Sequence, residues 1–427
     1  MEPRMTLTPE QRGILDGEKG ETLAKVMKTL VMYGETFGAE RMVPVTGEHG
    51  HLVTSFGLSV MKPLYALMDQ LIAAGAVSKR TFTVDPRPMD PNVPANLLQT
   101  VFFKVMYSQQ AAYEAQLGRL GLLGDDAYTC ACYQDEVGNI PKPGDVLSWA
   151  ESSAVVYANS VLGARCNRNS GILELFGGIL GFVPEFGLLT DEGRRASWVV
   201  EVRTSEKPEA QLLGSAIGMQ VQESVPYIEG LSAFLGTELD EANRAFLKDM
   251  GAATASNGAV GLYHVDGLTP EAKALGTSLV RPDAKVYVVD DAELRRVKAS
   301  YPDLWKKPDA RPKLCFVGCP HLSRAQLDEW TGRLEAALSA AGRRKVAVPT
   351  VFTAAPAVLA RFRETPAAAR LAAMGVVLSS ICPLMYMNNP MCHDLPVLTN
   401  SNKLRTYSTS RYATDAEILA ALSKGGR

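Results

Sequence analysis

Two cysteines follow directly on apolar runs of this chain, where chemistry is expected in an open parallel sheet. Cys319 comes after KLCFVG (313–318), and Cys382 ends GVVLSSIC (375–382). Because ligands collect beyond the carboxyl ends of parallel strands, both thiols are predicted to lie at one edge. A cluster with an open iron needs a third thiol, for which the N-terminal half offers Cys130, Cys132 and Cys166. Sulfur ligands suit zinc and iron–sulfur clusters, but no CxxC pair is present, so the spacing alone also allows buried, inert thiols.

The remaining cysteines point to packing. Cys315 lies inside the run before Cys319 and is expected in the core. Cys392, in NNPMCHDLP, is a loop thiol beside His393 for which a packing or solvent-facing position is favoured over a role as a ligand. The total of seven is odd, which argues against a disulfide framework in a large chain of this kind.

Polar residues elsewhere are candidates for binding anions. Arg165 and Arg168 flank Asn167 just after a predicted helix. Arginine holds carboxylates or phosphates through paired hydrogen bonds, although surface ion pairs are the alternative reading. The chain has no GxxxxGK[ST], GxGxxG or GxSxG motif, which disfavours the common kinases, nicotinamide dehydrogenases and hydrolases.

Four histidines are candidates for proton transfer. His49 and His51 sit in a glycine-flanked loop, His264 ends the strand-like run GAVGLYHV, and His321 follows Cys319. Each is a possible general acid or base, or a hydrogen-bonded structural group.

The elements that must position these residues are clearest in the last third of the chain. Strands alternate there with helices, one of which is capped by Ser323 and another by Thr414, and an alanine-rich helix with a break covers 354–373. This alternation predicts a doubly wound, mainly parallel sheet. Strands are expected at 285–291, 313–318, 345–352, 375–382 and 396–401.

The fold class is therefore α/β, with a C-terminal parallel α/β domain at 280–427 and an N-terminal α/β region at 1–279 that holds more than one subdomain. In that region Thr8 and Gln11 form a capping box, a helix is expected over 59–76, and Ser148 and Glu151 form a second capping box that opens a helix. The stretch 80–146 is rich in turn residues and resists assignment.

Composition excludes some functions. The net charge is −2 with basic residues spread along the chain, which gives no support to nucleic-acid or membrane-surface binding. The apolar stretch 171–189 holds two glutamates and is expected in the core, since a membrane span would have to bury both. The N-terminus lacks a signal-like apolar segment, so a cytoplasmic location is expected.

Several motifs, in order, resemble the large subunit of aconitase X over nearly the whole chain. They are SWAESSAVVYANSVLGAR (148–165), VPEFGLLTDEGR (183–194), HVDGLTPEA (264–272), GCPH (318–321), ICP (381–383) and TNSNK (399–403). The resemblance implies an aconitase-like fold and a lyase that removes water from a small hydroxylated carboxylate. Similar proteins dehydrate cis-3-hydroxy-L-proline, our first expectation, or phosphomevalonate. It also implies a partner, a small swivelling subunit that supplies a catalytic serine.

The resemblance further implies site residues. Cys130, Cys319 and Cys382 would hold an iron–sulfur cluster, [2Fe-2S] or [4Fe-4S], but the family's CTPY reads Cys130-Ala-Cys-Tyr here and its GAR is followed by Cys166, so Cys132 and Cys166 compete for the third place. His49 and His264 would handle protons and Lys403 would hold a second anionic group. The substrate would be bound by Ser152, Ser153, Arg165, Asn167 and Arg168.

Two alternatives belong to other classes. One is a non-catalytic metal-binding or regulatory subunit, which would bind metal without turnover. The other is a zinc-dependent hydro-lyase, which metal analysis and an absorption spectrum would separate from an iron–sulfur protein.

Overall fold

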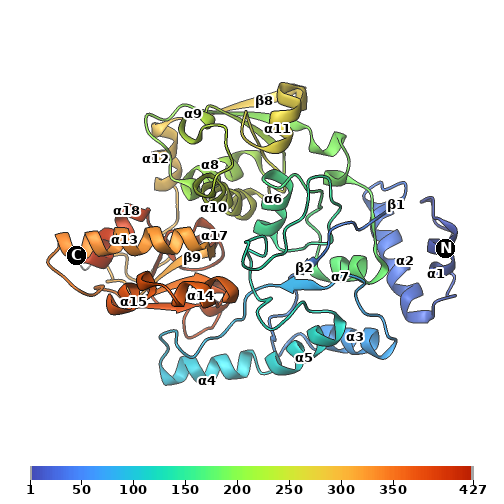
Figure 1. The fold of residues 1–427 in the computed structure, drawn as a ribbon, viewed down its shortest axis with the longest axis horizontal. Helices are drawn as coiled ribbons and strands as arrows, with labels where there is room; N and C mark the ends of the chain where they lie inside the picture. The colour runs from blue at the N-terminus through green and yellow to red at the C-terminus, as the bar shows by residue number, and fades with distance from the viewer. Residues whose placement is uncertain (1, 425–427) are drawn as a thin grey trace.

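Three regions follow one another along the chain in the computed structural model, which describes residues 2–424. The N-terminal region carries two small two-stranded sheets, the middle region a four-stranded sheet and the C-terminal region a five-stranded sheet. In Figure 1 the middle region lies above and the C-terminal region to the left, and segments of the N-terminal region fill the centre and reach the right-hand end.

The N-terminal region is mostly helical. Thr8 and Gln11 form the expected capping box before the first helix. The stretch 171–189 forms α7, β4 and a short 3-10 turn, with Glu174 and most of the apolar side chains of α7 buried. Its elements are α1 (Pro9–Leu15), α2 (Glu21–Thr36), β1 (Met42–Pro44), β2 (Gly50–Leu52), α3 (Lys62–Ala73), β3 (Phe82–Val84), α4 (Leu97–Met106), α5 (Gln110–Leu120), α6 (Ser152–Ser160), α7 (Gly171–Leu180) and β4 (Phe182–Pro184).

No helix within the described part of the chain has the length and apolar character needed to span a membrane.

The middle region is a parallel sheet in the order β7-β6-β5-β8. Helices α8 and α10 pack very closely, because a Cβ on Gly214 would lie 2.2 Å from the carbonyl oxygen of Met250. The elements are β5 (Ala196–Val202), α8 (Ala210–Val221), β6 (Pro226–Glu229), α9 (Ser232–Leu235), α10 (Glu241–Gly258), β7 (His264–Val265), α11 (Pro270–Leu275), β8 (Val280–Val289) and α12 (Asp291–Ala299), with 3-10 turns η1 (Gly187–Leu189), η2 (Glu192–Arg194) and η3 (Gly276–Leu279).

Strand β8 changes the domain boundary that the sequence led us to expect. It pairs with β5, with Val199 opposite Val286, and therefore belongs to the middle sheet rather than to the C-terminal one. We accordingly propose that the C-terminal domain begins after α12 instead of at residue 280.

The C-terminal region is a parallel sheet in the order β11-β10-β9-β12-β13, as the alternation of strands and helices predicts. Neighbouring residues of β9 enter two separate cores: Cys315 packs with one group of helices and Phe316 with another. The sheet is thus covered on both faces, and Cys315 is a packing thiol as expected. The elements are β9 (Leu314–Leu322), α13 (Arg324–Ala340), β10 (Thr350–Ala354), α14 (Pro356–Arg363), α15 (Pro366–Ala373), β11 (Val376–Ser379), α16 (Pro383–Met387), β12 (Val397–Thr399), α17 (Asn402–Tyr407), β13 (Arg411–Tyr412) and α18 (Asp415–Lys424).

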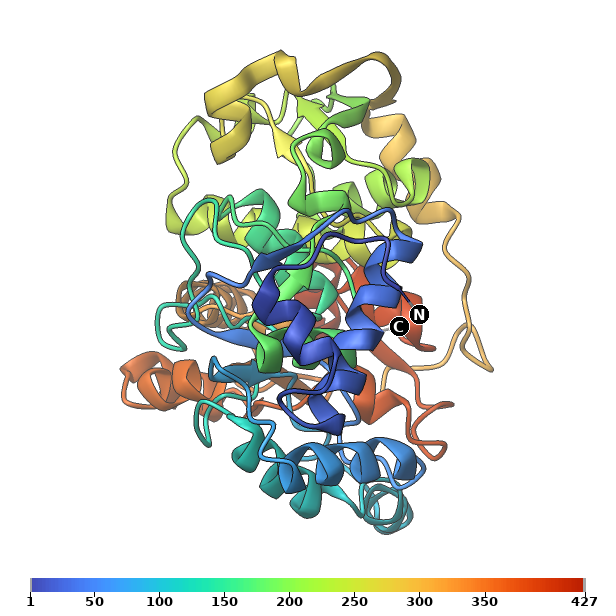
Figure 2. The ribbon, with the colours of Figure 1, turned by 90° about the vertical axis from the view of Figure 1, so that its right-hand side faces the viewer.

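The carboxyl ends of these strands bring the predicted thiols to one edge. Cys319 lies in the last part of β9, Cys382 follows β11, and Lys403 follows β12. Gly318, just before Cys319, has a φ of +109°, and a Cβ there would lie 2.4 Å from the carbonyl oxygen of Thr353. Glycine is therefore required for β9 to approach β10 closely at this point. Figure 2, turned by 90°, shows the middle region (green to yellow) at the top of the molecule and the first N-terminal helices (dark blue) in front of its centre.

Candidate active site

Three segments that carry cysteines meet at His321. The backbone N–H of His321 donates to the Cys130 sulfur at 3.4 Å. Its ring Nε2 lies 3.2 Å from the carbonyl oxygen of Ile381, and its Nδ1 lies 3.0 Å from Thr129 Oγ1. Because a carbonyl only accepts, Nε2 carries the proton, and Nδ1 accepts from the threonine hydroxyl. His321 thus joins the segments that precede Cys130 and Cys382 to its own, which carries Cys319.

The three predicted ligand cysteines share a surface property that the other four lack. Cys130, Cys319 and Cys382 are partly exposed, whereas the other four cysteines are buried. Removal of the thiols from water by the surrounding protein raises the pKa of Cys130 and of Cys319. For Cys382 the same effect, together with the nearby Cys319, raises the pKa to about 12. Cys319 also raises the pKa of Cys130, so it lies near both other thiols.

The two competing cysteines have other partners. The Cys166 thiol is fully buried and donates to the carbonyl oxygen of Trp149 at 3.3 Å. The Cys132 thiol is fully buried too; burial raises its pKa, and a hydrogen bond with Thr83 lowers it in part. Cys130 is therefore the N-terminal thiol that lies beside the His321 segment.

An ion pair connects this edge to helix α6. The Lys403 ammonium pairs with a Glu151 oxygen and donates to Ser153 Oγ at 3.0 Å. Burial disfavours the charged ammonium, but Glu151 and the nearby thiols outweigh this and raise the pKa of Lys403. Burial likewise disfavours the Glu151 carboxylate, but Lys403 lowers its pKa overall. Lys403 is thus a fixed positive charge beside Cys319 and Cys130.

Glu151 has a role that the sequence pattern misassigned. We expected Ser148 to cap the helix, but α6 begins at Ser152, and Glu151 is the N-cap that accepts from the backbone N–H of Ala154 at 2.7 Å. Ser148 instead donates to the backbone of Glu174 at 2.5 Å, outside the helix. The carboxylate of Glu151 therefore serves α6 with one oxygen and Lys403 with the other. Ser152 begins the helix and is half-buried.

The structure separates the three predicted anion-binding residues. Arg165 donates to the carbonyl oxygen of Leu189 at 2.9 Å and pairs with Asp191, and Asn167 donates to the carbonyl oxygen of Phe186 at 2.9 Å. Both hold the loop after β4. Arg168 differs: it donates to the carbonyl oxygen of Ala259, but its Nε is buried without a partner and the charge of Glu151 acts on it.

The two histidines predicted to handle protons have hydrogen-bond partners outside the Lys403–Glu151 pair. His49 is bonded through Nδ1 to Thr81 Oγ1 at 2.7 Å, with Glu48 3.9 Å from its Nε2. His264 is buried and donates from Nε2 to the carbonyl oxygen of Arg194 at 2.9 Å, within the middle region. The structure brings neither side chain into contact with Glu151 or Lys403.

A third histidine of the same N-terminal segment does lie at the site. His51, two residues after His49 in β2, is fully buried and bonded through Nδ1 to Thr83 Oγ1 at 2.8 Å. Burial lowers its pKa to about 4, so its ring is neutral, and the charges of Glu151 and Lys403 both act on it. Alternation along a strand puts residues 49 and 51 on equivalent faces, so only the tertiary contacts separate them.

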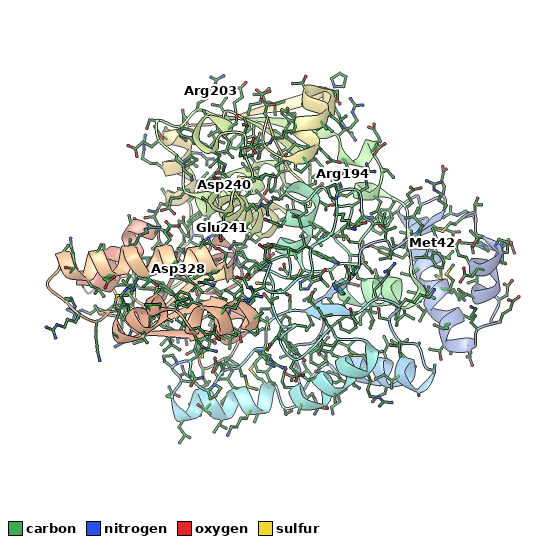
Figure 3. The ribbon with its side chains drawn as sticks, in the orientation of Figure 1. Met42, Arg194, Arg203, Asp240, Glu241 and Asp328 are labelled. Atoms are coloured by element: carbon green, nitrogen blue, oxygen red, sulfur yellow. The ribbon has the colours of Figure 1, made fainter. Side chains whose placement is uncertain are left out.

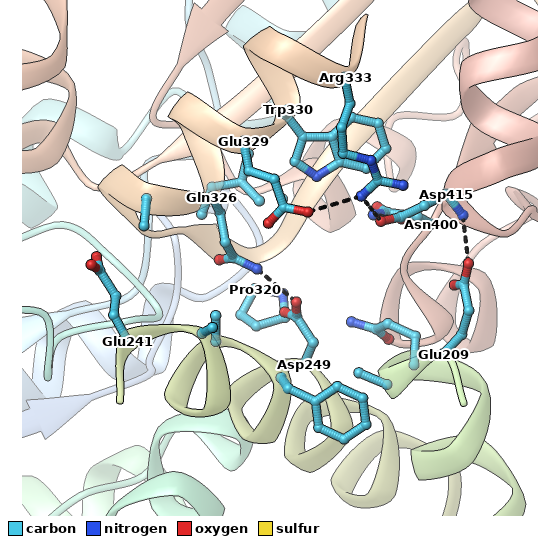
Figure 4. Close-up of a pocket in the computed structure, with 18 of the residues that line it drawn as sticks. Glu209, Glu241, Asp249, Pro320, Gln326, Glu329, Trp330, Arg333, Asn400 and Asp415 are labelled. Atoms are coloured by element: carbon cyan, nitrogen blue, oxygen red, sulfur yellow. Dashed lines mark hydrogen bonds and ion pairs between the residues drawn. The ribbon is translucent and has the colours of Figure 1, made fainter. Parts of the chain in front are cut away.

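A cavity of about 810 Å³ opens between the middle and C-terminal regions and reaches the backbone around Cys319. Figure 4 shows Gln326 donating to Asp249, while Arg333 pairs with Glu329 and Asp415. Most charged groups on its walls are carboxylates, including Asp240 and Glu241 at the start of α10, which are labelled in Figure 3. The excess of carboxylates on its walls disfavours the binding of an anion in this cavity.

The donor set has the chemistry of an iron–sulfur site. Among residues 2–424, no three Cys, His, Asp or Glu side chains surround one point closely enough to hold an ion. A cluster spreads its thiolates over different irons, and three partly exposed thiols beside a buried ammonium suit such a group.

Comparison with known proteins identifies the family of this chain. Residues 4–192 match the family description "Aconitase X first domain", and residues 196–299 match "Aconitase X second domain". The chain belongs to the aconitase X family. A crystal structure titled aconitase X, holo-form, from Thermococcus kodakaraensis superposes on it with a TM-score of 0.80 and 27% identity, covering 98% of this chain and 100% of that one.

Relatives in the aconitase X family carry two names. The phosphomevalonate dehydratase large subunit of Thermococcus kodakarensis is 32% identical over 76% of each chain, and that of Methanothermobacter thermautotrophicus is 34% identical over 76% of this chain and 75% of the relative. The cis-3-hydroxy-L-proline dehydratase of Pseudomonas aeruginosa is 27% identical over 93% of this chain and 65% of the relative. Both names describe dehydratases, and this member of the family is a hydro-lyase.

Proposed function

We propose that this chain is the cluster-bearing large subunit of an iron–sulfur dehydratase that acts on a small hydroxylated carboxylate. The observation that carries the proposal is the convergence of Cys130, Cys319 and Cys382 around His321, beside the Lys403–Glu151 pair. The thiolates of these cysteines would hold the cluster, which when bound supplies a Lewis-acidic iron. We favour Cys130 as the third ligand because it is partly exposed and contacts the His321 segment, whereas Cys132 and Cys166 are buried.

The protein side chains would bind and orient the substrate. Lys403, fixed by Glu151 and Ser153, supports a carboxylate of the substrate with a positive charge that does not titrate near neutral pH. Arg168, whose Nε lacks a partner, supports a second anionic contact from the middle of the molecule. Arg165 and Asn167 would support the site indirectly, because they hold the loop at 186–191 in place.

The reaction removes a hydroxyl group from one carbon and a proton from its neighbour. His49 and His264 are hydrogen-bonded to Thr81 and to the backbone of Arg194, so neither is our first candidate for the base that takes that proton. We propose that a small partner subunit supplies it, as a serine. The relatives named as large subunits support a two-subunit enzyme, as does the extra length of the Pseudomonas aeruginosa relative beyond the matched part.

A cytoplasmic location fits an oxygen-sensitive cluster and the reduced cysteines.

Two substrates are candidates. Relatives named for phosphomevalonate share 29–34% identity with this chain, and those named for cis-3-hydroxy-L-proline share 27–28%. This order supports phosphomevalonate as the first substrate to test, ahead of the cis-3-hydroxy-L-proline that we expected from the sequence. The hydroxyproline dehydratase matched over 93% of this chain keeps that substrate as the second.

The test is anaerobic reconstitution with iron and sulfide in the presence of the small subunit. We expect the absorption spectrum of an iron–sulfur cluster and dehydration of one of the two acids. Zinc in place of iron, with turnover, would identify the zinc-dependent alternative. A loaded cluster without turnover of either acid would leave the regulatory-subunit alternative and overturn the proposal.

A further inference from the structure

Two buried polar atoms face each other at the inner end of the site, and neither has a hydrogen-bond partner. They are Nε2 of His51 and Oδ1 of Asp85, which lie 3.9 Å apart. That distance is too long for a direct hydrogen bond. An unpaired buried polar atom costs about 1–3 kcal/mol, so two that face each other mark a place built to receive a polar group.

The histidine is held rigidly by groups behind it. Thr83 Oγ1 contacts Nδ1 of His51 at 2.8 Å and accepts from Nδ2 of Asn139 at 2.9 Å, while the same amide donates to the carbonyl oxygen of Gly50 at 2.9 Å. The ring of Trp149 packs edge-on against His51 with 5.7 Å between centroids. These contacts aim Nε2 at Asp85 and leave it no other partner.

The gap adjoins the charged groups of the proposed active site. The charges of Glu151 and Lys403 act on both His51 and Asp85, and the charge of Asp85 acts on the thiol of Cys382. The Asp85 side chain is about 10% exposed and that of Lys403 about 13%, although the Oδ1 atom of Asp85 that faces His51 is itself buried.

The two atoms have the chemistry of a hydroxyl receptor. When they carry one proton between them, one donates and the other accepts, whichever atom holds the proton. An oxygen about 2.8 Å from both would see them at an angle of about 90°, near the angle between the donor and acceptor directions of a hydroxyl. A carboxylate, which only accepts, satisfies one of the two atoms and not the other.

We propose that His51 and Asp85 bind the hydroxyl group that the substrate loses. This inference deepens the proposed function and rests on it for the identity of the substrates. Strand β2 and the residue after β3 would thus contact the reacting part of the substrate, while Lys403 would bind an anionic part of it.

The experiment compares each hydroxylated ligand with a counterpart that lacks the hydroxyl. The assembled, iron-loaded enzyme is titrated by calorimetry with cis-3-hydroxy-L-proline against L-proline, and with phosphomevalonate against its 3-deoxy analogue. The variants are His51→Phe, Asp85→Leu and the double variant. Exposed residues provide the matched controls His393→Phe and Asp126→Leu.

We expect the wild-type enzyme to prefer one hydroxylated ligand by at least ~10-fold, and the variants to bring that ratio close to one. Affinity for the deoxy ligand should change less than about threefold, and the double variant should unfold at the same or a higher denaturant concentration, because it removes two unpaired polar atoms. A preference that survives in both single variants would overturn the inference, as would a double variant that loses stability and both affinities equally. A wild-type enzyme that shows the preference but turns over neither acid would overturn the proposed function and leave this inference standing.

Discussion

Lys403 and Glu151 form an ion pair that joins the carboxyl edge of the C-terminal sheet to the N-cap of helix α6, across 252 positions of sequence. The Glu151 side chain is about 5% exposed, and one of its oxygens caps the helix while the other meets the lysine. Each partner therefore depends on the other to remain charged inside the protein.

Replacement of Lys403 by Met should leave the Glu151 carboxylate buried and unpaired. We expect a loss of about 3–5 kcal/mol in the free energy of unfolding, measured with urea. The double variant Lys403→Met/Glu151→Gln should recover part of that loss. The control Lys298→Met removes the more exposed pair with Glu417 and should cost at most about 1 kcal/mol. Equal losses in the two lysine variants would show that the buried pair has no special weight.

Single replacements of the three partly exposed cysteines should abolish iron binding. Cys130→Ser, Cys319→Ser and Cys382→Ser each remove one thiolate of the proposed set, whereas Cys132→Ser and Cys166→Ala leave it complete. Iron and sulfide are measured per chain after anaerobic reconstitution. Full iron retention in Cys319→Ser and Cys382→Ser would contradict the cluster assignment. Loss of iron in Cys132→Ser with retention of iron in Cys130→Ser would identify Cys132 as the third ligand instead.

His321→Phe should weaken the cluster without removing a thiol. The ring joins Thr129 to Ile381 by two hydrogen bonds, and a phenyl ring makes neither. Residues that orient ligands typically change metal affinity about 10–100-fold, so the variant should lose iron to a chelator that much faster than wild type. His393→Phe, at an exposed histidine, provides the comparison. Identical rates of iron loss would remove His321 from the support of the site.

Glu174→Gln should change how stability depends on pH. Burial raises the pKa of Glu174 to about 8, above its ordinary value of 4.5. The folded state therefore holds an extra proton between these values, and the free energy of unfolding falls as pH rises from 4.5 to 8. Asn169 donates to one oxygen at 2.6 Å and Ser148 lies 2.8 Å from the other, and a glutamine amide satisfies both.

The variant should match wild type near pH 5 and exceed its stability above pH 8 by at most roughly 3–5 kcal/mol. Thermal unfolding at a series of pH values measures the difference. Parallel curves for the two proteins across this range would contradict the assignment of a buried neutral carboxyl.

The C-terminal domain was predictable because its signals are local. The capping boxes at Ser323 and Thr414 and the break in the alanine-rich helix all appear as expected, with α14 ending at Arg363 and α15 beginning at Pro366. The strand at 345–352 begins later, at Thr350. Pairing partners are not local, which is why β8 was assigned to the wrong sheet.

The site was predictable in part for the same reason. Strand ends indicated Cys319, Cys382 and Lys403, but nothing near His51 shows that Thr83 and Asp85 lie against it. Glu151 followed the pattern of a capping box, and only its distant partner Lys403 shows that it belongs to the site. A charged residue just before a helix without any charged residue of its own, such as α6, is the signal that could have drawn attention to it.

The contacts of His321 bear on how the enzyme survives oxygen. Every group that holds the ring is part of the protein, so the three thiol-bearing segments stay in register through protein contacts alone. If the proposed cluster is lost to oxidation, the protein contacts of His321 remain to hold the three cysteine-bearing segments together. We expect resupply of iron and sulfide to restore activity to such a chain without synthesis of new protein.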